Sequence, residues 1–268
     1  MRRIPIAPDP KEGESLAGYM LRLSDRYGLA PGDISDAIGY HPKEKKIVAR
    51  RSPYRLTEDQ KSRIAQATGI SPERLVEMTL EHFDGRLFKA DLTKNIAKGV
   101  PWALGKRVSI WDTAYCPSCL ATTGTWFLAW HSRWNLICDR HRCVLLEGCP
   151  DCGKAPRDLR RQMWPKRRGE TERDMNNCRW ASNGKLCRGD LKKAVSEPVD
   201  QRLALAHSQL SNFVSGKSPA ILAGQPTDSV SFISDLVGLM HIVRLGEENH
   251  SARRLGKRFA MVPGDLPD

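Results

Sequence analysis

The spacing of apolar residues predicts two short helices near the start of the chain. Between residues 14 and 24, apolar positions recur every three or four residues, which is the period of one helix face. Gly28 can end this helix, because glycine readily adopts the left-handed conformation that closes many helices. Pro31 suits the first turn of a second helix that would end at Gly39. The expected inward-facing residues are Leu16, Tyr19, Leu23, Tyr27, Ile34, Ala37 and Ile38.

A second pair of helices is predicted between residues 57 and 79. Thr57 and Gln60 have the spacing of a capping box, in which two side chains accept hydrogen bonds at the helix start. That helix would end at Gly69, and Ser71 would begin its successor. Ala65 and Gly69 have the small-residue and turn positions of a helix-turn-helix corner. Because many helical hairpins share this pattern, it favours structural packing over the reading of a DNA groove.

Helical periodicity returns in the last third of the chain. Residues 200–214 and 229–243 carry apolar positions at helical spacing, with a loop at 215–219 between them. The basic stretches at 41–46 and 50–53 are also predicted loops. The expected core positions of the two late helices are Leu203, Leu205, Ala206, Leu210, Phe213, Phe232, Ile233, Leu236, Val237 and Met240.

The composition is that of an ordinary globular chain with an excess of positive charge. Hydrophobic residues make up 40% of the 268 residues, and no apolar run approaches the roughly 18 residues that span a bilayer. The chain does not start like a secretory signal, so we expect a soluble cytoplasmic protein. The net charge of +12 is concentrated in residues 113–195, where 16 Lys and Arg stand against 8 Asp and Glu. This favours a polyanionic partner such as DNA, and a solvated basic surface is the alternative.

All eight cysteines lie between Cys116 and Cys187. Without a secretion signal, this clustering favours metal thiolates over disulfides. A CxxC or CxxH turn brings two soft ligands to one side of a loop, and two such turns complete a tetrahedral zinc site. The spacing predicts two structural zinc ions, the first held by Cys116, Cys119, Cys138 and His141, and the second by Cys149, Cys152, Cys178 and Cys187.

These elements predict a mainly α fold with a small zinc-knuckle or zinc-ribbon module. We expect a helix-turn-helix-like domain over 1–112, a double zinc-finger module over 113–195 and a helical C-terminal region over 196–268. Four protein ligands close a zinc site to water and substrate, so both sites are predicted to stabilise the fold rather than to catalyse. The sequence contains no HExxH motif, and the stretch at 216–218 lacks the earlier glycine of a P-loop. We therefore expect no enzyme; a zinc-dependent nuclease or accessory enzyme would need an open metal site or paired carboxylates.

Two further residues are candidates for the first zinc site. Cys143 is left over from the ligand pairs and is interpreted as a small buried apolar residue, with an exchange for His141 or Cys138 as the alternative. His131 has no paired ligand beside it and is the weaker candidate.

Aromatic and basic residues form two other patterns inside the cysteine-rich module. Trp126, Trp130 and Trp134 repeat every four residues and would fall on one side of a helix or of a short hairpin. Packing against the zinc turns is favoured over a partner-binding surface. A basic loop between the ligands of the second site would contact phosphates or form a solvated insertion, and the sequence leaves both interpretations open. Its cations are Arg157, Arg160, Arg161, Lys166, Arg167 and Arg168, with Trp164 among them.

A series of short motifs follows a specific order along the chain. These are Gly13-Glu14-Ser15-Leu16, Leu21-Arg22-Leu23, Tyr115-Cys116-Pro117-Ser118-Cys119-Leu120, Trp130, Cys138-Asp139-Arg140-His141, Leu145 and Cys149-Pro150-Asp151-Cys152-Gly153. The order resembles that of the TniQ family of transposition-targeting proteins and of the related TnsD proteins, over about residues 4–195. The chain ends abruptly for a member of this family, as either a naturally short member or a truncated fragment would.

The resemblance implies a non-catalytic adaptor in DNA transposition. Family members link a chosen DNA target to a AAA+ ATPase regulator of the TnsC type, and through it to the transposase. Some read an attachment site directly, whereas others ride on a CRISPR RNA-guided effector complex, often as a dimer. The family fold is helical, with helix-turn-helix and zinc-finger motifs. A stand-alone, zinc-stabilised, sequence-specific DNA-binding protein is the alternative function.

The metal ligands of the family carry over unequally to this chain. They match Cys116, Cys119, Cys138, His141, Cys149 and Cys152. Cys178 and Cys187 are less regular, so the second site depends more on the spacing of its own cysteines.

Overall fold

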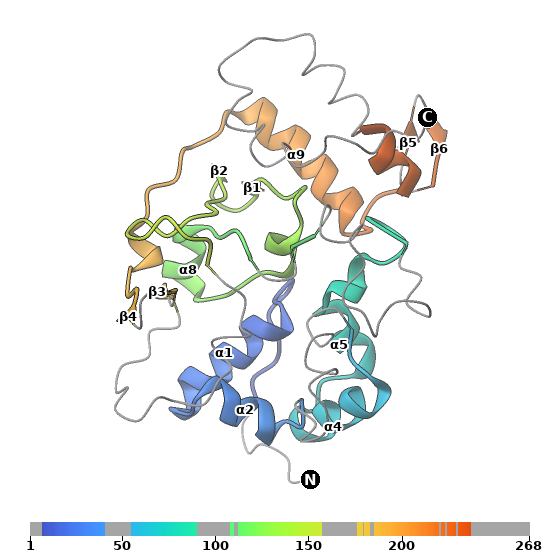
Figure 1. Ribbon diagram of the computed structural model, residues 1–268. Helices are drawn as coiled ribbons and strands as arrows, with labels where there is room; N and C mark the ends of the chain where they lie inside the picture. The colour runs from blue at the N-terminus through green and yellow to red at the C-terminus, as the bar shows by residue number, and fades with distance from the viewer. Residues whose placement is uncertain are drawn as a thin grey trace.

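The computed structural model gives a mainly helical fold with small hairpins. It describes residues 7–40, 55–89, 108–109, 112–156, 176–178, 180–182, 185–219, 221–222, 224–228 and 230–236. The main helices are α1 (Leu16–Tyr27), α2 (Pro31–Ala37), α4 (Glu58–Thr68), α5 (Pro72–Glu77), α8 (Pro117–Thr123) and α9 (Gln201–Val214). In Figure 1, α1, α2, α4 and α5 lie at one end of the molecule, α8 and the cysteine-rich module lie in the middle, and α9 lies towards the other end.

Short elements connect these helices. The described 3₁₀ turns are η1 (Leu80–Phe83), η2 (Leu128–His131) and η3 (Leu191–Lys193). The strands form antiparallel pairs of β1 (Ile137–Cys138) with β2 (Cys143–Val144), β3 (Ala181–Ser182) with β4 (Lys185–Leu186), and β5 (Ile221–Leu222) with β6 (Gln225–Pro226). Among the described residues, no helix combines the length and the apolar character needed to cross a bilayer.

The first helix pair has the predicted boundaries, except that α2 ends at Ala37, two residues before the predicted stop at Gly39. The Ser15 hydroxyl accepts a hydrogen bond from the Gly18 N–H at the start of α1, and Gly28 ends the helix with a φ of 61°. Pro31 begins α2. The expected inward-facing side chains are buried, except that Tyr27 is half-buried and Ala37 is exposed. The prediction for Ala37 is wrong: it is the last residue of α2 and its side chain is exposed, whereas the next residue, Ile38, is buried.

The second helix pair begins where the sequence predicts and α4 ends at the predicted glycine, whereas α5 ends at Glu77, two residues before the predicted limit. Thr57 and Gln60 exchange hydrogen bonds of 2.9 and 3.1 Å in the predicted capping box. Gly69 ends α4 with a φ of 81°, and Ser71 caps α5. The predicted loops at 41–46 and 50–53 lie outside the described residues.

Residues 13–16 fasten the N-terminal helices to the cysteine-rich module. Three backbone hydrogen bonds run from this segment to distant parts of the chain: Ser15 N–H to Trp126 O, Leu128 N–H to Gly13 O, and Leu16 N–H to Met78 O, at 2.8–3.0 Å. Because backbone groups buried at such a junction must be paired, the segment cannot shift without breaking all three bonds.

Glu14 is buried at the centre of this junction. Its carboxylate accepts two hydrogen bonds from the Arg22 guanidinium, with Nε–Oε1 at 2.9 Å and Nη2–Oε2 at 2.7 Å. The backbone N–H of Lys11 donates a third, at 2.9 Å. A buried carboxylate is tolerated when it is fully paired in this way, and the bidentate geometry fixes the orientation of α1.

Two hydrophobic clusters cross the predicted segment boundaries. The first joins residues of α1, α2, α4 and α5, such as Leu23 and Ile64, to Tyr115, Trp130 and the cysteines of the middle module. The second joins η1 to Trp134 and to the end of α9. The first two predicted segments therefore share a core, and the division into three domains stays a prediction.

The apolar face predicted for the C-terminal helix is only partly buried. α9 begins after Asp200 and ends at Val214, as expected, and Phe213 is buried. Leu203 and Leu205 are 42% and 62% exposed and Ala206 is exposed as well, so the prediction of these three as core residues is wrong. The first half of α9 instead contacts the β1–β2 hairpin through His207, a polar residue that the hydrophobic pattern does not count. Of the predicted helix at 229–243, residues 230–236 are helical and the rest lie outside the described residues.

We predict that Gly18→Ala destabilises the protein. A Cβ at this position would lie 2.8 Å from the Trp126 carbonyl oxygen and 2.9 Å from the Trp126 Cβ. Overpacking of this kind lowers the free energy of unfolding by about 1–3 kcal/mol, whereas helix propensity alone would raise it by about 1 kcal/mol. Denaturant unfolding measures the sign. Ser62→Ala, on the exposed side of α4, is the control, and a stabilised Gly18→Ala variant would contradict the close contact.

Candidate metal centres

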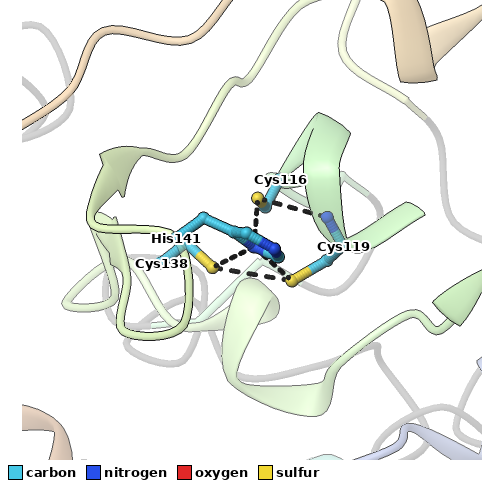
Figure 2. Close-up of side chains that lie close together, drawn as sticks. All are labelled: Cys116, Cys119, Cys138 and His141. Atoms are coloured by element: carbon cyan, nitrogen blue, oxygen red, sulfur yellow. Dashed lines mark hydrogen bonds between the residues drawn. The ribbon is translucent and has the colours of Figure 1, made fainter. Parts of the chain in front are cut away.

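The first cluster is assembled from α8 and the β1–β2 hairpin. Cys116 caps the start of α8 with its sulfur, which accepts a hydrogen bond from the Cys119 N–H at 3.4 Å. Cys138 ends β1, and His141 lies in the turn that leads to β2. Figure 2 shows the four side chains pointing toward one another from these two elements.

The spacing of the four donor atoms is that of a tetrahedral metal site. His141 Nδ1 lies 3.5, 3.3 and 3.5 Å from the sulfurs of Cys116, Cys119 and Cys138, and the sulfurs of Cys119 and Cys138 are 3.5 Å apart. Zinc bonds of ~2.3 Å to sulfur and ~2.0–2.1 Å to nitrogen give tetrahedron edges of about 3.5–3.8 Å. The cluster can therefore hold such an ion with small adjustments, and its four protein donors leave no coordination position open.

Close packing of the donors splits the pKa values of the thiols. Hydrogen bonds from Cys116 and Cys119 hold the pKa of Cys138 far below its usual range. The same hydrogen bonding, together with burial, raises the pKa of Cys116. A bound cation would favour the thiolate at all three cysteines, since the thiolate is the metal-binding form.

The second cluster joins a tight turn to the ends of the β3–β4 hairpin. Cys149 and Cys152 lie in the turn, whereas Cys178 precedes β3 and Cys187 follows β4. The sulfurs of Cys149 and Cys187 are 3.8 Å apart, and those of Cys152 and Cys178 are 3.7 Å apart. All four sulfurs lie within 4.8 Å of one another. The hairpin accounts for the eight residues between Cys178 and Cys187, because it returns the chain to its starting point.

A glycine allows the turn and the hairpin to approach. A Cβ at Gly189 would lie 2.7 Å from the Cys149 sulfur. The Gly189 carbonyl also accepts a hydrogen bond from the Cys178 N–H at 2.7 Å. Any larger side chain at this position would push the two halves of the cluster apart.

Cys143 and His131 lie outside the two clusters. Cys143 is buried, and its sulfur is 3.7 Å from the Cys116 sulfur, but it does not join the group of four mutually close donors. His131 is also buried and donates from Nδ1 to the Ser109 carbonyl at 3.0 Å. These positions support the interpretation of Cys143 as a small core residue and give His131 a structural partner.

The three tryptophans are all buried, as expected for packing, but they do not share one side. Trp126 and Trp130 meet edge to face in the first hydrophobic cluster, with ring centroids 5.9 Å apart. Trp134 belongs to the second cluster. The prediction of a single aromatic side is wrong because the chain leaves η2 and turns between Trp130 and Trp134.

Exposed cations lie next to several of the cluster residues. Arg140 and Arg142 flank His141, Lys154 follows Cys152 by two positions, and Arg188 follows Cys187. No motif in the sequence marks these four cations, although each stands within two residues of a predicted ligand. The predicted basic loop of Arg157, Arg160, Arg161, Lys166, Arg167 and Arg168, with Trp164, lies outside the described residues.

Comparison with known proteins gives one family. The sequence model of the TniQ family matches residues 5–145, which is more than half of the chain. The match includes the N-terminal junction and all four residues of the first cluster. No curated protein matches the chain.

Single substitutions should separate the cluster residues from their neighbours. We expect Cys119→Ser to remove one of two bound zinc ions and to unfold the middle module, because such modules fold with their metal. Cys143→Ser should leave the zinc content unchanged, since its sulfur stands outside the group of four. Metal analysis of the purified variants measures both. An unchanged zinc content in Cys119→Ser, or a loss in Cys143→Ser, would contradict the ligand assignment.

Proposed function

The chain belongs to the TniQ family, and on that premise we propose that it is a non-catalytic adaptor of DNA transposition. It would link a selected DNA target to a AAA+ ATPase regulator of the TnsC type, and through it to the transposase. Membership in the family makes the chain a transposition-associated protein. The adaptor role is the proposal that goes beyond this membership. The observation that carries it is that both candidate metal centres are closed, so they hold surfaces in place rather than activate a substrate.

We propose zinc as the ion in both centres. Three sulfurs with one imidazole nitrogen, and four sulfurs, are the donor sets of structural zinc sites. Zinc would cross-link turns that are distant in sequence and contribute free energy of folding. Within the described part of the chain, these are the two groups of His, Cys, Asp or Glu with metal-binding spacing.

The α4–α5 pair supports a packing role rather than groove reading. Its second helix has six residues, and Glu73 and Glu77 lie exposed on it. At the start of α4, the side chains of Glu58 and Asp59 are 83% and 73% exposed. Glu58, Asp59 and Glu77 are ion-paired with Lys61, Arg63 and Arg74, so this face has no excess of positive charge to attract the phosphates of a DNA duplex.

The exposed cations beside the metal clusters offer a better surface for phosphates. Arg140, Arg142, Lys154 and Arg188 stand on turns that the metal centres would hold rigid. Such contacts position a nucleic acid without reading its sequence. They suit an adaptor in the cytoplasm that meets its target as DNA or through a CRISPR RNA-guided effector complex, alone or as a homodimer.

Co-sedimentation tests the adaptor role. The zinc-loaded full chain is mixed with the purified AAA+ ATPase encoded beside it, with and without ATP and duplex DNA. We expect saturable, ATP-dependent binding at one end of the ATPase–DNA filament. Cys143→Ser should bind as the wild type does, and Cys119→Ser should not. No binding, combined with tight sequence-specific DNA binding by the chain alone, would instead favour a stand-alone zinc-stabilised DNA-binding protein.

The salt dependence of nucleic-acid binding tests the cation surface. We expect Lys154→Gln combined with Arg188→Gln to weaken binding at all sequences and to reduce the slope of log K against log salt by about 2, since each phosphate contact contributes about 0.9. Arg26→Gln, at an exposed position of α1, is the matched control and should leave the slope unchanged. An unaltered slope in the double variant would assign the contacts elsewhere, with the basic residues at 157–168 as the next set to replace.

A further inference from the structure

Residues 197–199, just before α9, pair with the β2 side of the β1–β2 hairpin in the manner of a third strand. The Val144 N–H donates to the Glu197 carbonyl, and the Val199 N–H donates to the Arg142 carbonyl, both at 2.9 Å. Cys143 and Pro198 form an antiparallel bridge between these two bonds. The C-terminal region is therefore attached along the same hairpin that supplies half of the first metal cluster.

His207 adds a second attachment from α9 itself. Its side chain is buried, and its Nε2 lies 3.1 Å from the Leu136 N and 3.4 Å from the Ile137 N. A ring nitrogen that accepts backbone N–H groups carries no proton, so the proton resides on Nδ1. Nδ1 donates to the Asp139 carboxylate at 3.1 Å. The imidazole thus bridges two backbone N–H groups and one carboxylate.

These contacts lie on both sides of a cluster residue. Leu136 and Ile137 immediately precede Cys138, and Asp139 immediately follows it. His141, the other donor of this turn, stands two residues further along. A side chain that holds both flanks of Cys138 restricts the backbone that aims its sulfur, and it does so without touching the metal position.

We propose that His207 is a positioning residue for the first metal centre, so that binding of the ion and docking of α9 stabilise each other. This inference rests on zinc occupancy of the first cluster, which is part of the proposed function, and is independent of the transposition partners. His207 lies beyond residues 5–145, so the support comes from outside the segment that the TniQ family model matches. Because coupling between two equilibria is reciprocal, loss of the ion should also loosen α9.

Site-resolved metal release from the full chain tests the proposal. Groups hydrogen-bonded directly to metal ligands typically contribute about 10–100-fold to metal affinity. His207 holds the backbone beside Cys138 instead, so we expect His207→Ala to release the first ion to a chelator up to about 10-fold faster, while the second ion leaves at the wild-type rate. Cobalt(II) loading identifies the site, since a three-sulfur, one-nitrogen centre and a four-sulfur centre have different visible spectra. His207→Gln should largely restore slow release, because its amide can accept from the backbone N–H groups and donate to Asp139.

Two further variants distinguish a specific effect at the first site from a general loss of structure. Asp139→Ala removes one contact at an exposed side chain and should speed release of the first ion by a smaller factor. Gln209→Ala, at an exposed position of α9, should leave both rates unchanged. Hydrogen exchange on the wild type should show that residues 201–214 lose protection as the first ion leaves.

Three outcomes would overturn the proposal. The first is a wild-type release rate from the first site in both His207→Ala and Asp139→Ala. The second is an equal acceleration at both sites, which would mark His207 as a general structural residue. The third is a wild-type chain that binds no ion at the first cluster, and this result would also remove zinc from the proposed function. The first two would leave zinc and the adaptor role intact.

Discussion

The middle of this molecule is organised around two clusters of four metal-binding side chains each. The elements that carry them are small: α8 has seven residues, and each strand has two. Elements of this length do not persist in water by themselves, so their arrangement depends on cross-links between distant turns. The rest of the structure is attached to this module, because the N-terminal junction bonds to the Trp126–Leu128 stretch and α9 bonds to the β1–β2 hairpin.

Under the proposed function, two closed metal centres would serve transposition without catalysing a step. A centre with four protein donors has no position for water or substrate, and its effect is to fix the relative positions of the surfaces around it. Cations stand beside the donors on the same turns, whereas the cations of the α4–α5 face are paired with exposed carboxylates. The two kinds of surface would orient a polyanionic target toward the metal module and leave the helical end for other contacts.

Features set by short stretches of sequence were predictable, and those set by distant partners were not. The capping box at Thr57, the glycine stops at Gly28 and Gly69 and the grouping of the cysteines depend on residues a few positions apart, and they agree with the structure. Leu203 and Leu205 were misplaced because α9 is held by a buried histidine, which helical periodicity counts as polar. Trp134 was misplaced for a similar reason: a turn after η2 sends it to a different core from that of Trp130.

X-ray absorption at the zinc edge on the purified full chain tests the central claim most directly, since it counts and identifies the atoms bound to the metal. The account predicts two zinc ions per chain. Together the two ions would have seven sulfur ligands and one nitrogen ligand, and neither would have an oxygen ligand. A single ion per chain, or an oxygen ligand that marks an open coordination position, would contradict two closed structural centres and return catalytic chemistry to consideration.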